Sequence, residues 1–136
     1  ESQRIIKEVS FKPSFHEKIY FIYLNKKQSS ISEIENYNNK ASDSIINEIT
    51  NITSMILKCN SLVEYDKLIE SHELIISKLL SKPTVKETLF KDFNGSIKSL
   101  GAWGGDMVMA TSQSDPNRYF IGKGYSTIFK FEELLL

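Results

Sequence analysis

The residues of this chain best suited to chemistry lie in a glycine-rich stretch, GSIKSLGAWGGDMVMA, at positions 95–110. Within it, Gly101, Gly104 and Gly105 carry no Cβ, so successive backbone N–H groups could converge there on an oxyanion such as phosphate. Neither a P-loop GxxxxGK[ST] pattern nor a GxGxxG pattern is present. These residues alone therefore leave two alternatives open, a bulged hairpin and a ligand-binding loop.

A second polar segment, NKKQSS at positions 25–30, follows an apolar run. Ammonium and hydroxyl donors such as Lys27, Ser29 and Ser30 at the end of a strand suit an anion. The alternative is a solvated turn followed by a helix cap, and the local sequence favours that alternative.

The remaining reactive side chains stand alone. His16 and His72 lack the paired Cys, His or carboxylate spacing of a metal site, so we predict structural or surface roles for them and no metal site. Cys59 has no recognisable base partner, and we expect a small buried apolar group rather than a nucleophile.

Composition limits the classes of partner. A chain of 136 residues fits one domain, and its 17 basic and 17 acidic residues lack the positive excess of nucleic-acid-binding proteins. One cysteine excludes an internal disulfide. No signal peptide and no bilayer-spanning apolar run is evident, so we expect no membrane partner and a cytoplasmic location.

Runs of β-branched and aromatic residues or alternating apolar positions predict the strands. We expect a buried strand at KIYFIYL (18–24), an antiparallel hairpin formed by SIKSL (96–100) and DMVMAT (106–111), and a last strand within YSTIFKF (125–131). RIIKEV (4–9) is a further candidate strand.

Capping boxes predict the starts of several helices, because a Ser or Thr hydroxyl and a Glu three residues later satisfy free N–H groups there. The helix signals are Ser30 with Glu33, an apolar stripe of Ile45, Ile49, Ile52 and Ile56, Ser61 with Glu64, Thr84 with Glu87, and a short helix begun by Asp115-Pro116 and ended by Gly124. The order predicts an α+β fold of the ferredoxin-like βαββαβ type: an antiparallel sheet with helices on one face and extra helices in the first crossover.

The segment KSLGAWGGDMVMA (98–110) resembles the third motif of the GHMP small-molecule kinases, K-x-T-G-A-G-G-G-G followed by an apolar strand. The matching residues are Lys98, Gly101, Ala102, Gly104 and Gly105, whereas Leu100 replaces the usual Thr and Trp103 and Asp106 replace glycines. IYFIYLNKKQSS (19–30) is similar to the strand and turn that begin the C-terminal domain of that family, and SHELI (71–75) resembles its helix before the motif. The resemblance extends from about Phe11 to the C-terminus.

The resemblance implies the C-terminal half of an ATP-dependent kinase that transfers the γ-phosphoryl group to a small metabolite such as mevalonate, phosphomevalonate or homoserine. The family's main nucleotide loop and catalytic Asp and Lys belong to an N-terminal domain that nothing here matches. Residues 1–136 would thus be a single-domain fragment, inactive alone. Its partners would be ATP, Mg²⁺, the acceptor and its own N-terminal domain.

By the same resemblance, the backbone of residues 101–105 would face the phosphates or the acceptor, Lys98 would support the strand, and the turn of Lys27, Ser29 and Ser30 would line the acceptor side. Trp103 would either block phosphate or form an apolar wall. Two other functions stay open: a small-molecule-binding or regulatory module, and a kinase-like protein that has lost activity. Exposed sheet edges would also permit a homodimer.

Overall fold

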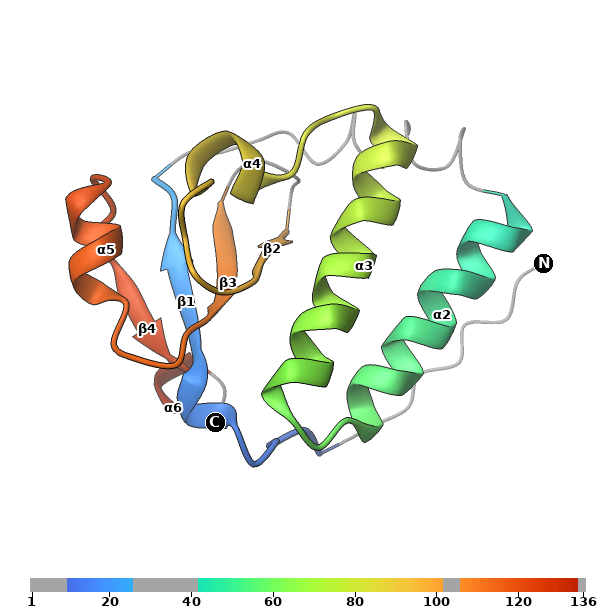
Figure 1. Cartoon of the computed structure of the whole chain (residues 1–136), viewed down its shortest axis with the longest axis horizontal. Helices are drawn as coiled ribbons and strands as arrows, with labels where there is room; N and C mark the ends of the chain where they lie inside the picture. The colour runs from blue at the N-terminus through green and yellow to red at the C-terminus, as the bar shows by residue number, and fades with distance from the viewer. Residues whose placement is uncertain (1–9, 26–41, 102–105, 135–136) are drawn as a thin grey trace.

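The computed structural model describes residues 10–25, 42–101 and 106–134 (Figure 1). The elements in chain order are the 3₁₀ turn η1 (His16–Lys18), β1 (Ile19–Tyr23), α2 (Asp43–Lys58), α3 (Leu62–Leu80), α4 (Val85–Leu89), β2 (Ile97–Leu100), β3 (Met107–Thr111), α5 (Asn117–Gly122), β4 (Ile128–Lys130) and α6 (Phe131–Leu134). The predicted RIIKEV strand and the predicted helix from Ser30 lie outside the described residues.

The strands form one antiparallel sheet in the order β2-β3-β1-β4. β1 and β3 lie at its centre, with Phe21 opposite Met109 and Ile22 opposite Val108. β2 and β3 are neighbours in the sheet as well as in the chain. The predicted α+β class and the predicted hairpin are therefore confirmed.

Helices α2 and α3 begin where polar side chains satisfy their first N–H groups. Ser42 accepts a hydrogen bond from the Ile45 N–H, and Ser61 accepts one from the Glu64 N–H, which is one of the two hydrogen bonds of its predicted capping box. The predicted isoleucine stripe is the less exposed side of α2. The α2 helix packs against α3, and its Ile52 and Ile56 also contact the core.

One face of the sheet is covered by α3. Ile19 and Phe21 of β1 and Met109 of β3 share this face, because alternate residues of a strand point to the same side. They form a buried cluster with Tyr65, Ile69 and neighbouring apolar side chains. The Tyr65 hydroxyl donates a hydrogen bond to Met109 Sδ at 3.1 Å.

The opposite face is also covered, so the prediction of helices on one face is wrong. Ile22 and Val108 belong to a second buried cluster, which includes Val85 of α4, Phe90 at the end of α4 and Phe120 of α5. In Figure 1 the sheet accordingly lies between α5 on one side and the α2–α3 pair on the other. The central strands are apolar on both faces, and each face needs its own cover.

Two elements near the C-terminus, α5 and β4, begin and end at other residues than the sequence predicted. Pro116, rather than Asp115, is the N-cap of α5, while Asp115 Oδ1 accepts a hydrogen bond from the Asn117 N–H at 2.8 Å. Gly124 follows the helix with φ +97°, the conformation predicted for a glycine past a helix end. Strand β4 is three residues long, because Phe131 already begins α6. No helix in the described ranges is long and apolar enough to cross a bilayer.

Candidate functional site

Gly101 and Asp106 form the base of the glycine loop, and both have backbone conformations with positive φ, +69° and +55°. A Cβ added to Gly101 would lie 3.1 Å from the Asp106 Oδ2 atom. The Asp106 carboxylate therefore packs against the Gly101 backbone. The other predicted loop residues, Ala102, Trp103, Gly104 and Gly105, lie outside the described part of the chain.

The end of β1 lies directly beside this loop base. The Leu24 N–H donates a hydrogen bond of 2.7 Å to the backbone oxygen of Asp106. Because β1 and β3 are antiparallel neighbours, the chain leaves β1 at the end of the sheet where the loop enters β3. The structure thus brings together the points where two predicted site segments begin. Lys27, Ser29 and Ser30 themselves lie outside the described residues.

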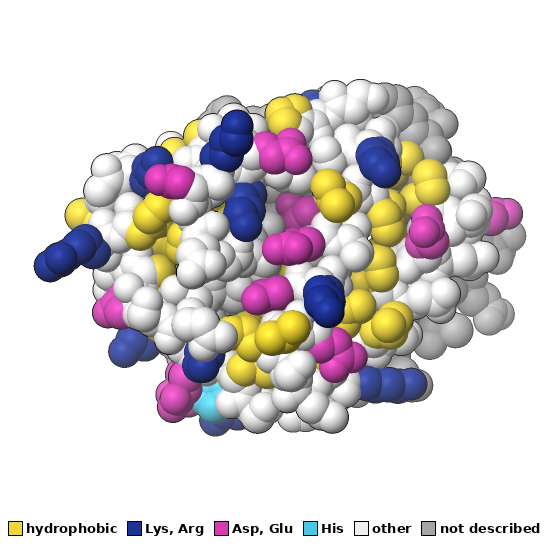
Figure 2. Space-filling model, viewed as in Figure 1, with side chains coloured by type: hydrophobic (Ala, Val, Ile, Leu, Met, Phe, Trp, Pro, Cys, Tyr) yellow, Lys and Arg dark blue, Asp and Glu magenta, His cyan; other side chains and the backbone are white. Residues whose placement is uncertain are grey.

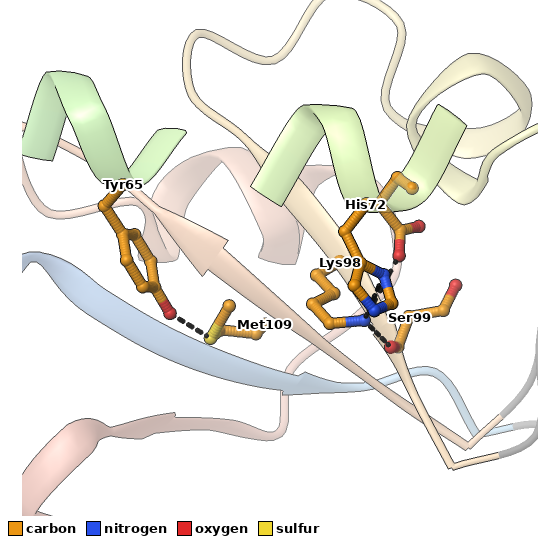
Figure 3. Close-up of polar contacts among 6 residues, drawn as sticks. Tyr65, His72, Lys98, Ser99 and Met109 are labelled. Atoms are coloured by element: carbon orange, nitrogen blue, oxygen red, sulfur yellow. Dashed lines mark hydrogen bonds and ion pairs between the residues drawn. The ribbon is translucent and has the colours of Figure 1, made fainter. Parts of the chain in front are cut away.

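Lys98, the one predicted loop-proximal cation, is directed at helix α3 (Figure 3). Its Nζ atom lies 3.3 Å from His72 Nδ1 and 3.5 Å from Glu73 Oε1. It also donates to the backbone oxygen of Ser99 at 3.5 Å. Lys98 therefore joins the edge strand β2 to α3.

Lys98, His72 and Glu73 form a polar cluster between β2 and α3. Its acidic residue, Glu73, is buried, with 3% of its surface exposed. Burial raises the pKa of its carboxyl group from 4.5 to about 7, although the Lys98 ammonium and the Ser99 backbone N–H act in the opposite direction. Among the described residues, its Oε2 atom has no hydrogen-bond partner, and neither has the buried Ser99 Oγ. Such atoms cost free energy unless something else satisfies them.

His72 is neutral in this surrounding. Burial lowers the pKa of its imidazole from 6.5 to about 4, and the nearby Lys98 ammonium lowers it further. An ammonium group can only donate hydrogen bonds, so His72 Nδ1 accepts and Nε2 carries the ring proton. The cluster at pH 7 consequently contains one cation, one neutral imidazole and one carboxyl group that is near its titration midpoint.

A cleft of about 310 Å³ opens beside Glu73, between α3, α4 and β2. We call it the Glu73 cleft; its lining includes Glu70, Glu73 and Leu74 of α3, Lys86 and Glu87 of α4, and Ile97 of β2. Figure 2 shows the surface hollowed at this place, with acidic side chains gathered over α3. Thr84 and Glu87 hold the start of α4 at the cleft through the predicted capping box, which is complete.

A second polar cluster fixes α3 against the sheet. Asp66 Oδ1 accepts hydrogen bonds from Ser96 Oγ at 2.7 Å and from Thr111 Oγ1 at 2.6 Å. The adjoining Gly95 has no room for a side chain, since an added Cβ would lie 2.0 Å from the Thr111 backbone oxygen. These contacts set the position of α3 along β2 and thereby place Glu73 beside Lys98.

Neither Glu73 nor Asp66 was predicted as a site residue. For Glu73 the sequence contains one usable signal: it lies four residues after Ile69 and three before Ile76, within the apolar stripe of α3. A charged residue in such a stripe indicates a buried group with a special partner. The partner could not be read from this pattern, because Lys98 is 25 residues away in the chain.

The chemistry open to these residues is hydrogen bonding and ion pairing. Within the described ranges, no three His, Cys, Asp or Glu side chains lie close enough together to hold a metal ion. The chain matches no protein-family model, and no curated protein is similar to it.

Proposed function

We propose that this chain is the C-terminal domain of a GHMP-type small-molecule kinase, with its glycine loop and the segment after β1 shaping the acceptor side of a phosphoryl-transfer site. The proposal rests on the resemblance of residues 98–110 and 19–30 to that family. The structural observation that supports it most strongly is the hydrogen bond from the Leu24 N–H to the backbone oxygen of Asp106. It brings together the ends of two segments that the resemblance assigns to one site.

The order of the strands supports the same proposal. A ferredoxin-like βαββαβ chain pairs its first strand with both the third and the fourth, and β1 here pairs with β3 and β4. We infer a variant of that fold, in which α5, the helix between β3 and β4, lies with α4 on the face opposite to α3.

The described residues do not fit direct contact with ATP phosphates. At the loop base the Asp106 carboxylate packs against Gly101 and presents hydrogen-bond acceptors where a phosphate needs donors. The Lys98 ammonium is engaged by His72 and Glu73 of α3. The ATP phosphates would accordingly be held by the N-terminal domain, and the part of this domain would be to position the acceptor.

The direct test is a phosphoryl-transfer assay of the gene product that includes the residues preceding Glu1. Purified protein is incubated with ATP, Mg²⁺ and each of mevalonate, phosphomevalonate, homoserine and galactose, and ADP formation is measured. Acceptor-dependent turnover by the longer protein, with none by residues 1–136, supports the proposal. Turnover by residues 1–136 alone contradicts it, as does an upstream sequence without a Gly-Ser-rich phosphate loop.

A kinase-like domain without activity is the second candidate, and the Asp106 carboxylate beside Gly101 favours it. The variants Trp103→Gly and Asp106→Gly restore the glycines usual in the family. If the longer protein is inactive and both variants stay inactive while remaining folded, the second candidate is preferred. If either variant gains acceptor-dependent turnover, the divergent loop suppresses a working site.

A further inference from the structure

We propose that the Glu73 cleft binds a small primary ammonium compound, whose charged group pairs with the Glu73 carboxylate and whose short alkyl part lies against Leu74 and Ile97. This site is separate from the glycine loop, and the inference does not depend on the proposed kinase function. It rests on the burial of Glu73, on the hydrogen-bonding state of the cleft lining and on the dimensions of the cleft.

Glu73 provides an acceptor that the described protein leaves unused. The residue is 3% exposed, it lines the cleft, and its Oε2 atom has no hydrogen-bond partner within the described chain. Oε1, by contrast, is paired with the Lys98 ammonium at 3.5 Å. A buried carboxylate oxygen without a donor is costly, so a ligand that brings donors gains from satisfying it.

The other polar groups of the lining favour a cation over an anion. The Lys86 ammonium already donates to the Gly95 backbone oxygen at 2.6 Å, and the Glu87 carboxylate accepts from the Thr84 N–H at 3.4 Å. Glu70 adds another carboxylate to the wall, whereas Lys91 stands at the exposed rim. The lining thus holds three acidic side chains, Glu70, Glu73 and Glu87, against two basic ones, Lys86 and Lys91, and the buried Glu73 Oε2 atom is an acceptor without a donor.

The size of the cleft limits the ligand to a small molecule. About 310 Å³ is at the lower end of the range for sites that bind small molecules. Leu74 and Ile97 give the wall an apolar part that suits a short alkyl chain. Oε2 has almost no exposed surface, so the Glu73 side chain must turn toward the cleft for the ligand to reach it.

Binding should strengthen as the pH rises through the titration of Glu73. The groups that face Glu73 are Lys98 from β2, His72 and Glu70 from α3, and Lys86, Glu87 and Lys91 from the α4 side. In the absence of ligand the Glu73 pKa is about 7, so much of the carboxyl group is protonated below neutral pH and unable to pair with an ammonium group. His72, with a pKa of about 4, stays neutral over the same range.

The test is titration of the 136-residue chain with n-butylammonium chloride, followed by ¹H–¹⁵N NMR spectra. For so small a probe we expect roughly millimolar affinity, with shifts confined to the α3, α4 and β2 segments of the cleft. Replacing Glu73→Gln keeps the shape and removes the charge, and should weaken binding roughly tenfold or more. Glu64→Gln is the matched control, because it removes an exposed carboxylate from the same helix outside the cleft.

Two further experiments separate the effect of the ligand's charge on binding from the effect of the shape of the cleft. Butan-1-ol and sodium butyrate have the same alkyl part without the cation, and we expect neither to saturate the cleft. Leu74→Trp narrows the cleft at a half-exposed position without changing its charges, and should also weaken binding. The proposal is overturned if butylammonium does not saturate, if butan-1-ol binds equally well, or if Glu73→Gln binds as tightly as Glu64→Gln.

Discussion

Replacing Glu73→Gln should make the fold more stable at alkaline pH and change how its stability depends on pH. In the folded chain the carboxyl pKa is raised from 4.5 to about 7, so the folded state holds this proton more tightly than the unfolded state does. Raising the pH through this interval therefore removes stability from the unmodified chain. Each unit of pKa difference changes the free energy of unfolding by about 1.4 kcal/mol, so the difference between 4.5 and about 7 corresponds to about 3 kcal/mol of stability.

His72 produces the opposite trend, which must be separated from that of Glu73. Its pKa is lowered from 6.5 to about 4, so the unfolded state binds the proton first and stability is lost as the pH falls through this interval. Between about pH 4.5 and 6.5 the two contributions oppose each other, and the unmodified chain should show little net change from this pair. The Glu73→Gln variant should instead gain stability up to about pH 6.5, because only the His72 contribution remains.

The measurement is urea denaturation followed by circular dichroism at several pH values from about 4.5 to about 8. The free energy of unfolding of Glu73→Gln minus that of the unmodified chain should rise by about 3 kcal/mol across this range. Glu64→Gln serves as the control, since it removes an exposed carboxylate from the same helix and leaves Glu73 in place. A constant difference for Glu73→Gln would mean that Glu73 is ionised throughout, and the reasoning from its burial would be refuted.

Substitutions at three other positions, two of them with a comparison variant, test the contacts that position the cluster, and each is measured by urea denaturation at neutral pH. Gly95→Ala should lower the free energy of unfolding by about 3 kcal/mol, because its Cβ would collide with the Thr111 backbone oxygen. Gly124→Ala should lower it by only about 1 kcal/mol, because its φ is positive but its surroundings are open. Equal losses of stability would contradict the steric argument. Asp66→Ala should lower the free energy of unfolding by about 3 kcal/mol, because two hydroxyl groups lose their acceptor. Asp66→Asn should lower it less, because an amide oxygen can still accept both hydrogen bonds; equal losses for the two variants would show that these hydrogen bonds do not stabilise the fold. Thr84→Ala should cost about 1 kcal/mol through loss of the α4 cap, and an unchanged midpoint would show that the cap contributes nothing.

Much of the secondary structure could be predicted because its signals are local. The apolar run at 18–24 gave strand β1, and the Thr84–Glu87 spacing gave the start of α4 with both capping hydrogen bonds. The period-two segments around the glycine loop gave the β2–β3 hairpin. Each of these signals depends on residues close together in the chain, where spacing alone decides which groups can meet.

The layering of the fold was not predicted, although a sign of it was present. An uninterrupted apolar run such as IYFIY belongs to a strand buried on both faces, which is incompatible with helices on one face only. The sequence did not indicate which helix would cover the second face. That depended on Phe90 and Phe120, 30 positions apart in the chain, meeting over Ile22.

By itself the sequence determined the class of fold, the extent of several described elements and the resemblance of the glycine loop to a kinase motif. Only the tertiary structure decided that Lys98 contacts α3, that Asp106 presents a carboxylate at the loop base, and that Glu73 is buried beside a cleft. The physical reason is that burial and pairing depend on contacts between distant segments. A glutamate in an apolar stripe shows that a compensating partner is needed, but the partner is set by how α3 lies along β2.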